Sequence, residues 1–190
     1  MLIIGLTGLA GAGKTTVADY LKEKHGFVKL TFSDILLKEA LKRGLLKEVK
    51  SKDEERVKIV LSKLGDKMRK ESGKMGILAE LLCKEIKEKR LEKVCVDGFR
   101  SPEEVILFKK EFGNDFILIK VYASESVRVE RLKRRDPSIN IEKLKERDKR
   151  DLKLKGLEET LKMADLELNN DCSLKELYER VDNLLKSLKR

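Results

Sequence analysis

The stretch Gly8-Leu9-Ala10-Gly11-Ala12-Gly13-Lys14-Thr15 follows a short apolar segment, residues 2–7, and leads into a helical pattern, residues 15–25. Glycine loses more conformational freedom on folding than any other residue, so a loop this rich in glycine is costly to order. Such a loop is useful where the main chain has to approach a ligand closely. The stretch therefore predicts a ligand-binding turn between a strand and a helix.

Residues 8–15 match the P-loop pattern G-x-x-x-x-G-K-[ST]. In this pattern, successive backbone N–H groups and the start of the following helix surround phosphate oxygens. Lys14 is expected to reach the β- and γ-phosphates of ATP, and Thr15 to offer its hydroxyl group to Mg²⁺. The dinucleotide pattern G-x-G-x-x-G is not met, because Thr16 stands in place of its last glycine. The predicted ATP-binding residues of the loop are Gly8, Gly11, Ala12, Gly13, Lys14, Thr15 and Thr16.

Five apolar segments alternate with helical patterns along the 190 residues: 2–7, 27–31, 93–97, 116–122 and 164–168. Continuous apolar runs of this length are typical of parallel strands that are covered on both faces. We therefore predict an α/β fold: a three-layer sandwich with a five-stranded parallel sheet, formed by residues 1–190 as a single P-loop domain.

Two stretches, residues 32–92 and 124–160, are longer than a single crossover helix needs. Ligands of α/β sheets bind outside the carboxyl ends of the strands. We expect residues 32–92 to form a helical insert on the acceptor side and residues 124–160 to form a basic lid.

Asp97 closes the third apolar segment and resembles the Walker-B acid that holds the water shell of Mg²⁺ beside a P-loop. The alternative is an ordinary acidic residue in a turn. Arg100 is expected at the mouth of the sheet, where a guanidinium group suits a phosphate or a carboxylate; the alternative is a surface arginine. Ser101, Pro102 and Glu104 predict the start of the next helix.

Asp34 follows the second apolar segment and could orient or deprotonate an acceptor hydroxyl group. The alternative is that Ser33 or Asp34 only caps the next helix. Arg69, further along the insert, either binds an acceptor phosphate or lies on a solvated helix face.

The basic excursion contains many arginines, and helical spacing places Arg128, Arg131 and Arg135 on one face. Arginines that close over a moving phosphoryl group stabilise its negative charge. The alternatives are a solvated helix face or an unspecific basic localisation segment. The arginines concerned are Arg128, Arg131, Arg134, Arg135, Arg147 and Arg150.

The chain has a formal net charge of +10, and 41% of its residues are charged. This composition fits either a thermostable surface, as in proteins of thermophiles, or a site for anionic ligands. The sequence argues against a nucleic-acid partner, because no aromatic residues alternate with a basic stripe. Three cysteines and the single His25 form no metal-ligand pattern, so buried reduced thiols are expected. No apolar run has the length of a membrane span, so we expect a soluble, cytoplasmic protein.

Residues 5–21 and 94–105 resemble the P-loop kinases of nucleotides and small metabolites. The segment VDGFRSPEEV is similar to the DGFPR segment of adenylate kinases, although its proline is missing here. The arginine of that segment binds the phosphate of the acceptor, and by resemblance this role falls on Arg100.

The segments ERLKRRD and ERDKRD resemble the arginine-bearing lid of the same enzymes. This likeness places Arg131 and either Arg134 or Arg135 near ATP, and Arg147 and Arg150 near the transferring phosphates.

Residues 164–181 are similar to the C-terminal stretch of dephospho-CoA kinases, which also carry an acid soon after strand two, where Asp34 stands. The whole chain is most similar to archaeal adenylate-kinase-related proteins, which share the segment seen here as LGDKMRKESGKMGILA, residues 64–79. One position departs from the adenylate kinases: three residues after the acid they carry an arginine, and here Leu37 stands there.

The resemblance implies an ATP-dependent kinase that uses Mg²⁺, which Thr15 and Asp97 would hold through water. Arg100 indicates a nucleoside monophosphate as acceptor, whereas Asp34 and the C-terminal stretch indicate the hydroxyl group of dephospho-CoA. A P-loop NTPase that acts as a switch or a nucleic-acid-associated factor is the alternative from another class. The catalytic residues expected on this basis are Lys14, Asp34, Arg100, Arg131, Arg134, Arg147 and Arg150.

Overall fold

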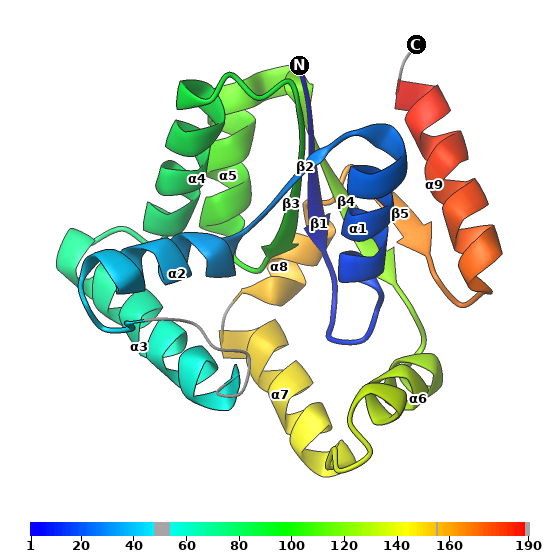
Figure 1. Ribbon diagram of the computed structural model, residues 1–190. Coiled ribbons are helices and arrows are strands. Elements are labelled where there is room, and N and C mark those ends of the chain that lie inside the picture. Colours follow the sequence, from blue (N-terminus) through cyan, green and yellow to red (C-terminus); the bar gives the residue numbers. More distant parts are fainter. Residues whose placement is uncertain (48–53, 155, 189–190) are drawn as a thin grey trace.

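The computed structural model describes residues 1–47, 54–154 and 156–188 (Figure 1). Its centre is a five-stranded sheet with the order β2-β3-β1-β4-β5, in which all neighbours are parallel. This confirms the predicted α/β sandwich. The strands are β1 (Leu2–Thr7), β2 (Val28–Thr31), β3 (Lys93–Phe99), β4 (Phe116–Tyr122) and β5 (Leu166–Asn169).

Helices cover both faces of the sheet. One apolar core joins the sheet to α1 and α9, and a second joins it to the helices between β2 and β4. Figure 1 shows α2 and α3 on one side, and α6 and α7 on the other, beyond the carboxyl ends of the strands. The helices are α1 (Lys14–His25), α2 (Phe32–Lys42), α3 (Glu54–Ser72), α4 (Ile77–Glu88), α5 (Pro102–Phe112), α6 (Glu125–Arg135), α7 (Ile141–Leu154), α8 (Leu157–Lys162) and α9 (Leu174–Leu188).

Two strand boundaries differ from the predicted ones for local reasons. β5 begins at Leu166 instead of residue 164, because the Asp165 carboxylate accepts the backbone N–H of Leu118 at 2.8 Å, where a strand residue would otherwise pair. β2 begins at Val28 because Gly26, with a φ of 71°, ends α1 just before it.

An aromatic cluster fixes the carboxyl end of β3. The Phe99 ring is fully buried and lies 5.2 Å from the Phe32 ring, 4.9 Å from that of Phe108 and 5.4 Å from that of Phe116, between ring centroids. Gly5 of β1 lies beneath these rings, and a Cβ atom there would come within 2.7 Å of Phe99. The cluster therefore fixes the position of Phe99, the last residue of β3.

The three cysteines are free thiols, and two of them follow the expectation of burial. Cys83 and Cys95 are buried, whereas Cys172 is half-buried. Burial raises the pKa of the Cys83 thiol to about 12, so this group stays protonated at neutral pH.

Within the described ranges, no group of three or more His, Cys, Asp or Glu side chains could hold a metal ion. No helix within the same ranges is both long enough and apolar enough to cross a membrane.

The aromatic cluster gives a first prediction. Phe99→Ala should lower the free energy of unfolding by about 3–5 kcal/mol, because it removes a large and fully buried side chain. Urea denaturation followed by circular dichroism measures this change. Ile106→Ala on α5 is the control, since its side chain is 57% exposed and should contribute less than about 0.5 kcal/mol. Equal losses for the two variants would show that the cluster does not carry this part of the fold.

Candidate active site

The P-loop runs from β1 to α1 and packs against β4 and the segment after β5. Gly8 has a φ of 145°, and a Cβ atom there would lie 2.3 Å from the carbonyl oxygen of Val121. Gly13 has a φ of 99°, and a Cβ atom there would lie 2.2 Å from Nδ2 of Asn170. These glycines are therefore required by the walls of the loop as well as by its conformation.

Asn170 is the side chain that supports the loop from the carboxyl end of the chain. It is 2% exposed, and its Nδ2 donates a hydrogen bond of 2.8 Å to the carbonyl oxygen of Ala12. Its own backbone N–H bonds to the carbonyl oxygen of Tyr122 at 2.7 Å. Asn170 was not among the predicted site residues, although it lies in the stretch 164–181 that resembles dephospho-CoA kinases.

Lys14 is folded back over the loop. Its Nζ donates hydrogen bonds of 2.7 Å to the carbonyl oxygen of Gly8 and 3.0 Å to that of Leu9. The ammonium group is therefore held directly above the bare backbone where a P-loop lysine meets phosphate oxygens.

Thr15 and Asp97 meet across the sheet because β1 and β3 are neighbours, with Leu6 opposite Asp97. The Thr15 hydroxyl donates to Oδ2 of Asp97 at 2.9 Å. Oδ1 of Asp97 is buried and has no hydrogen-bond partner among the described residues. Hydroxyl and carboxylate oxygens are the hard ligands that Mg²⁺ prefers, so this donor set fits that ion.

Asp34 lies at the first turn of α2, beside the same edge of the sheet. Its Oδ2 accepts the backbone N–H of Thr31 at 3.1 Å, and the Thr31 hydroxyl accepts the N–H of Asp34 at 3.0 Å. The capping alternative is thus part of the structure, with Thr31 rather than Ser33 as the cap. Thr31 is paired with Asp97 in the β2–β3 register. The exposed Asp34, three residues after Thr31, therefore lies at the same end of the sheet as Asp97.

Arg100 is exposed just past the end of β3, and a buried carboxylate holds its backbone. Glu104 accepts the N–H of Arg100 at 2.9 Å and that of Ser101 at 3.2 Å, and it is 4% exposed. Burial raises the pKa of Glu104, opposed by these two N–H donors and by the charges of Arg69 and Arg100. The predicted helix start is confirmed, because α5 begins at Pro102.

Arg128 ties the lid region to the P-loop. Its Nη1 donates to the carbonyl oxygen of Ala10 at 2.9 Å and lies 2.8 Å from Oδ2 of Asp148 on α7. Both partners of this ion pair are largely buried. Gly11, with a φ of 79°, packs here too, since a Cβ atom there would lie 2.9 Å from the carbonyl oxygen of Arg128. The prediction placed Arg128 in the basic excursion but not among the site residues.

Arg131 lies beside the start of α1. Its Nη2 donates to the backbone oxygen of Asn170 at 2.9 Å. Its Nη1 is buried without a hydrogen-bond partner in the part of the chain that the structure describes, and it lies 3.9 Å from the position of a Cβ atom on Gly13. The structure thus places Arg131 at the P-loop.

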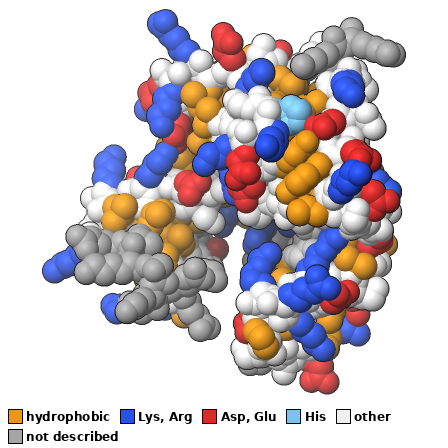
Figure 2. Space-filling view, turned by 45° about the vertical axis from the view of Figure 1, so that its right-hand side comes forward, with side chains coloured by type: hydrophobic (Ala, Val, Ile, Leu, Met, Phe, Trp, Pro, Cys, Tyr) orange, Lys and Arg blue, Asp and Glu red, His pale blue; other side chains and the backbone are white. Residues whose placement is uncertain are grey.

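Two other predicted lid arginines, Arg134 and Arg150, are exposed. Arg134 is 76% exposed and pairs with Glu130 on its own helix at 2.5 Å. Arg150 on α7 is exposed, and the side chain of Arg147 on the same helix lies outside the described residues. Figure 2 shows Lys and Arg side chains over the lobe that α6 and α7 form, with a hollow beside it.

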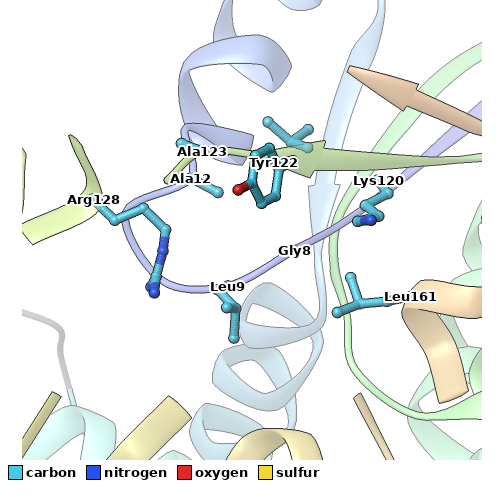
Figure 3. A pocket seen from close by; sticks show the side chains of 9 residues that line it. Gly8, Leu9, Ala12, Lys120, Tyr122, Ala123, Arg128 and Leu161 are labelled. Atoms are coloured by element: carbon cyan, nitrogen blue, oxygen red, sulfur yellow. The ribbon is translucent and has the colours of Figure 1, made fainter. Parts of the chain in front are cut away.

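A pocket lies behind the P-loop, and Figure 3 shows Arg128 at one end and Lys120 with Leu161 at the other. Lys120 is paired with Glu167 at 2.7 Å, so its charge is already compensated. This pocket is a small gap between the loop, β4 and α8 rather than a second anion site. The lining residues are Gly8, Leu9, Ala12, Lys120, Val121, Tyr122, Ala123, Arg128 and Leu161.

Comparison with protein families and curated proteins gave consistent matches. Residues 4–163 match a family model described as an AAA domain. A UPF0200 protein of Methanosarcina mazei is 34% identical over 97% of this chain and 94% of its own length. One from Thermococcus onnurineus is 32% identical over 98% of both chains. The UPF0200/UPF0201 protein of Archaeoglobus fulgidus is 35% identical over 99% of this chain, which spans only 56% of that relative.

Solved structures share the fold at low identity. TT1252 from Thermus thermophilus has a TM-score of 0.60 and 24% identity over 98% of this chain and 97% of its own. Shikimate kinase from Acinetobacter baumannii has a TM-score of 0.58 and 16% identity over 98% and 94%. A gluconokinase from Sinorhizobium meliloti has a TM-score of 0.52 and 16% identity over 99% and 95%. The fold is therefore that of P-loop kinase-like proteins.

The buried ion pair gives a second prediction. Arg128→Ala should lower the free energy of unfolding by about 3–5 kcal/mol, because Asp148 is then left as a buried charge without its counter-ion. Arg134→Ala is the control, because it removes an exposed charge from α6, the helix that also carries Arg128. It should lower the free energy of unfolding by less than about 0.5 kcal/mol. Thermal and urea unfolding of both variants measure the difference. A loss below about 1 kcal/mol for Arg128→Ala would mean that this pair does not hold the lid region to the loop.

Proposed function

We propose that this chain, which belongs to the UPF0200 proteins and carries an AAA domain, is a kinase that transfers the γ-phosphoryl group of ATP to a small phosphorylated acceptor. The observation that carries the proposal is the Thr15–Asp97 hydrogen bond of 2.9 Å beside Lys14. Two of the structural neighbours are kinases of small molecules by name, which supports transfer to a small acceptor.

In the proposed reaction, the loop backbone and the start of α1 bind the phosphates of ATP. Lys14 turns from the carbonyl oxygens of Gly8 and Leu9 to the phosphate oxygens. Thr15 and Asp97 would hold Mg²⁺, which would supply positive charge against the negative charge of the phosphates. Arg131, beside the start of α1, adds a cation on the ATP side.

The basic region 124–160 is proposed to act as a lid that excludes water during transfer. Arg128 holds one end of this region to the P-loop through Ala10 and to α7 through Asp148. Closure over ATP and acceptor would bring the remaining arginines, Arg134, Arg147 and Arg150, toward the transferring phosphates.

The proposed acceptor is a nucleoside monophosphate, and Arg100 supports this choice. A phosphate acceptor is already ionised, so it needs a cation to position it and no general base. Arg100 is exposed at the end of β3, three residues past Asp97, and its backbone is fixed by Glu104.

The second candidate is a kinase of a hydroxyl group, such as that of dephospho-CoA. Asp34 supports it, because a carboxylate at this edge of the sheet can orient or take the proton of a hydroxyl group. Its bond to the N–H of Thr31 uses Oδ2. A hydroxyl acceptor would therefore approach the other oxygen of the carboxylate.

A third prediction tests the acceptor. ATP, Mg²⁺ and each acceptor are given to the protein separately, and products are followed by mass. We expect a diphosphate product from AMP or another nucleoside monophosphate. Product from dephospho-CoA alone would support the hydroxyl route, and Asp34→Asn should then slow transfer by about 10²-fold or more. ADP formation at one slow rate with every acceptor would indicate an NTPase switch.

A fourth prediction tests the P-loop lysine. Lys14→Ala should lower turnover by about 10²-fold or more while leaving the thermal unfolding temperature close to that of the unchanged protein, because the lost cation acts on the transferring phosphates. Lys22→Ala, on the exposed face of the same helix, is the matched control and should keep its activity. Near-normal turnover of folded Lys14→Ala would contradict the assigned role.

A further inference from the structure

The segment Leu64-Gly65-Asp66-Lys67-Met68-Arg69 of α3 has no part in the transfer described above. Leu64 and Met68 face the core, with 2% and 6% of their surface exposed. Gly65 and Arg69 lie one helical turn apart on another face. A Cβ atom on Gly65 would lie 3.4 Å from Nη1 of Arg69 and 3.6 Å from the Leu36 side chain of α2. The absence of a side chain at Gly65 thus leaves room for the guanidinium group where α3 crosses α2.

The Arg69 guanidinium group lies between two carboxylates, and N–H donors remain for a ligand. It lies 4.0 Å from Oε1 of Glu104 and 3.5 Å from Oδ1 of Asp66, and its side chain is 28% exposed. Within the described ranges, no hydrogen bond to this guanidinium group accompanies these two ion pairs. A guanidinium group has five N–H donors, so several of them are available to a ligand.

Glu104 connects Arg69 to the acceptor side of the sheet. Its Oε2 accepts the backbone N–H of Arg100 at 2.9 Å, while its Oε1 faces Arg69. The buried carboxylate of Glu104 therefore contacts both the guanidinium group of Arg69 and the backbone of Arg100. Arg100 directly follows the strand whose Asp97 meets Thr15.

We propose that Arg69 and Arg100 together bind the phosphate dianion of the acceptor, and that Glu104 is the positioning residue that sets them side by side. This inference rests on the proposed kinase function and narrows its acceptor to phosphomonoesters. Two guanidinium groups match a phosphate that carries nearly two negative charges, whereas a neutral hydroxyl group needs neither.

The test measures binding rather than turnover. The protein is saturated with Mg²⁺ and the non-hydrolysable analogue β,γ-imido-ATP, so that the P-loop is filled. AMP is then titrated by calorimetry, with adenosine as the probe that lacks the phosphate. The ratio of the two dissociation constants reports recognition of the phosphate group.

The protein is expected to bind AMP more tightly than adenosine, and Arg69→Ala should reduce this preference by about tenfold or more. Lys67→Ala is the matched control, because it removes a 64% exposed cation from the same helix, and it should change the ratio less than about twofold. Arg69→Gln keeps the β- and γ-methylene groups and a polar end without the charge, and it serves as a second variant if Arg69→Ala unfolds.

Glu104→Gln tests the positioning role. The amide oxygen of Gln can still accept the N–H groups of Arg100 and Ser101, but its NH₂ group no longer attracts Arg69. We expect weaker AMP binding with unchanged affinity for the ATP analogue. A structural role alone would lower the unfolding temperature and leave the ratio of AMP to adenosine binding as it was.

Several results would overturn the inference. One is an unchanged ratio in folded Arg69→Ala or Arg69→Gln, and another is a protein that does not prefer AMP over adenosine. Either result can stand beside product formation in the acceptor panel, and the proposed function would then survive without this site. Selective AMP binding that depends on Arg69, together with no product from any acceptor, would keep the site and remove the kinase function.

Discussion

A backbone that is kept bare for phosphate has no side chains to hold it, so its shape has to come from groups elsewhere in the chain. Here the carbonyl oxygen of Val121 and the amide group of Asn170 stand where Cβ atoms of Gly8 and Gly13 would be. The guanidinium of Arg128 holds the loop from its other side. Since the loop carries the lysine and the threonine of the site, all of the proposed chemistry depends on these contacts.

The order of the strands decides which side chains share the site. β1 lies between β3 and β4, and β3 lies between β1 and β2. Thr15 therefore meets Asp97. Asp34 lies at the same end of the sheet, because Thr31, three residues before it, pairs with Asp97. Arg131 comes from α6, which follows β4, and Arg100 follows β3. In the proposed reaction, the ATP-side cation Arg131 and the acceptor-side cation Arg100 therefore come from opposite sides of β1.

The P-loop, the strands and Asp97 could be predicted because each produces a recognisable pattern within a short run of residues. Apolar runs and fixed spacing are local signals. Asn170 and Glu104 could not be assigned in this way, because their roles arise from contacts with segments distant in sequence or from burial under other helices. Helical spacing grouped the lid arginines, but it could not tell which face of α6 meets the loop. The structure turns Arg128 inward and leaves Arg134 in solvent.

The support of the P-loop also has a consequence for how the chain is made. The ribosome completes β1 and the loop first, whereas the hydrogen bonds from Arg128 and Asn170 to the loop span 118 and 158 residues. In a nascent chain, the P-loop sequence is therefore present long before Arg128 and Asn170, which hold the loop. The two strands that pair with β1, β3 and β4, also follow later in the sequence. The full set of contacts around the loop therefore forms only after Asn170 has been added to the chain. A chain that stops before Asn170 would thus carry the motif without the side chain that supports Gly13 and Ala12.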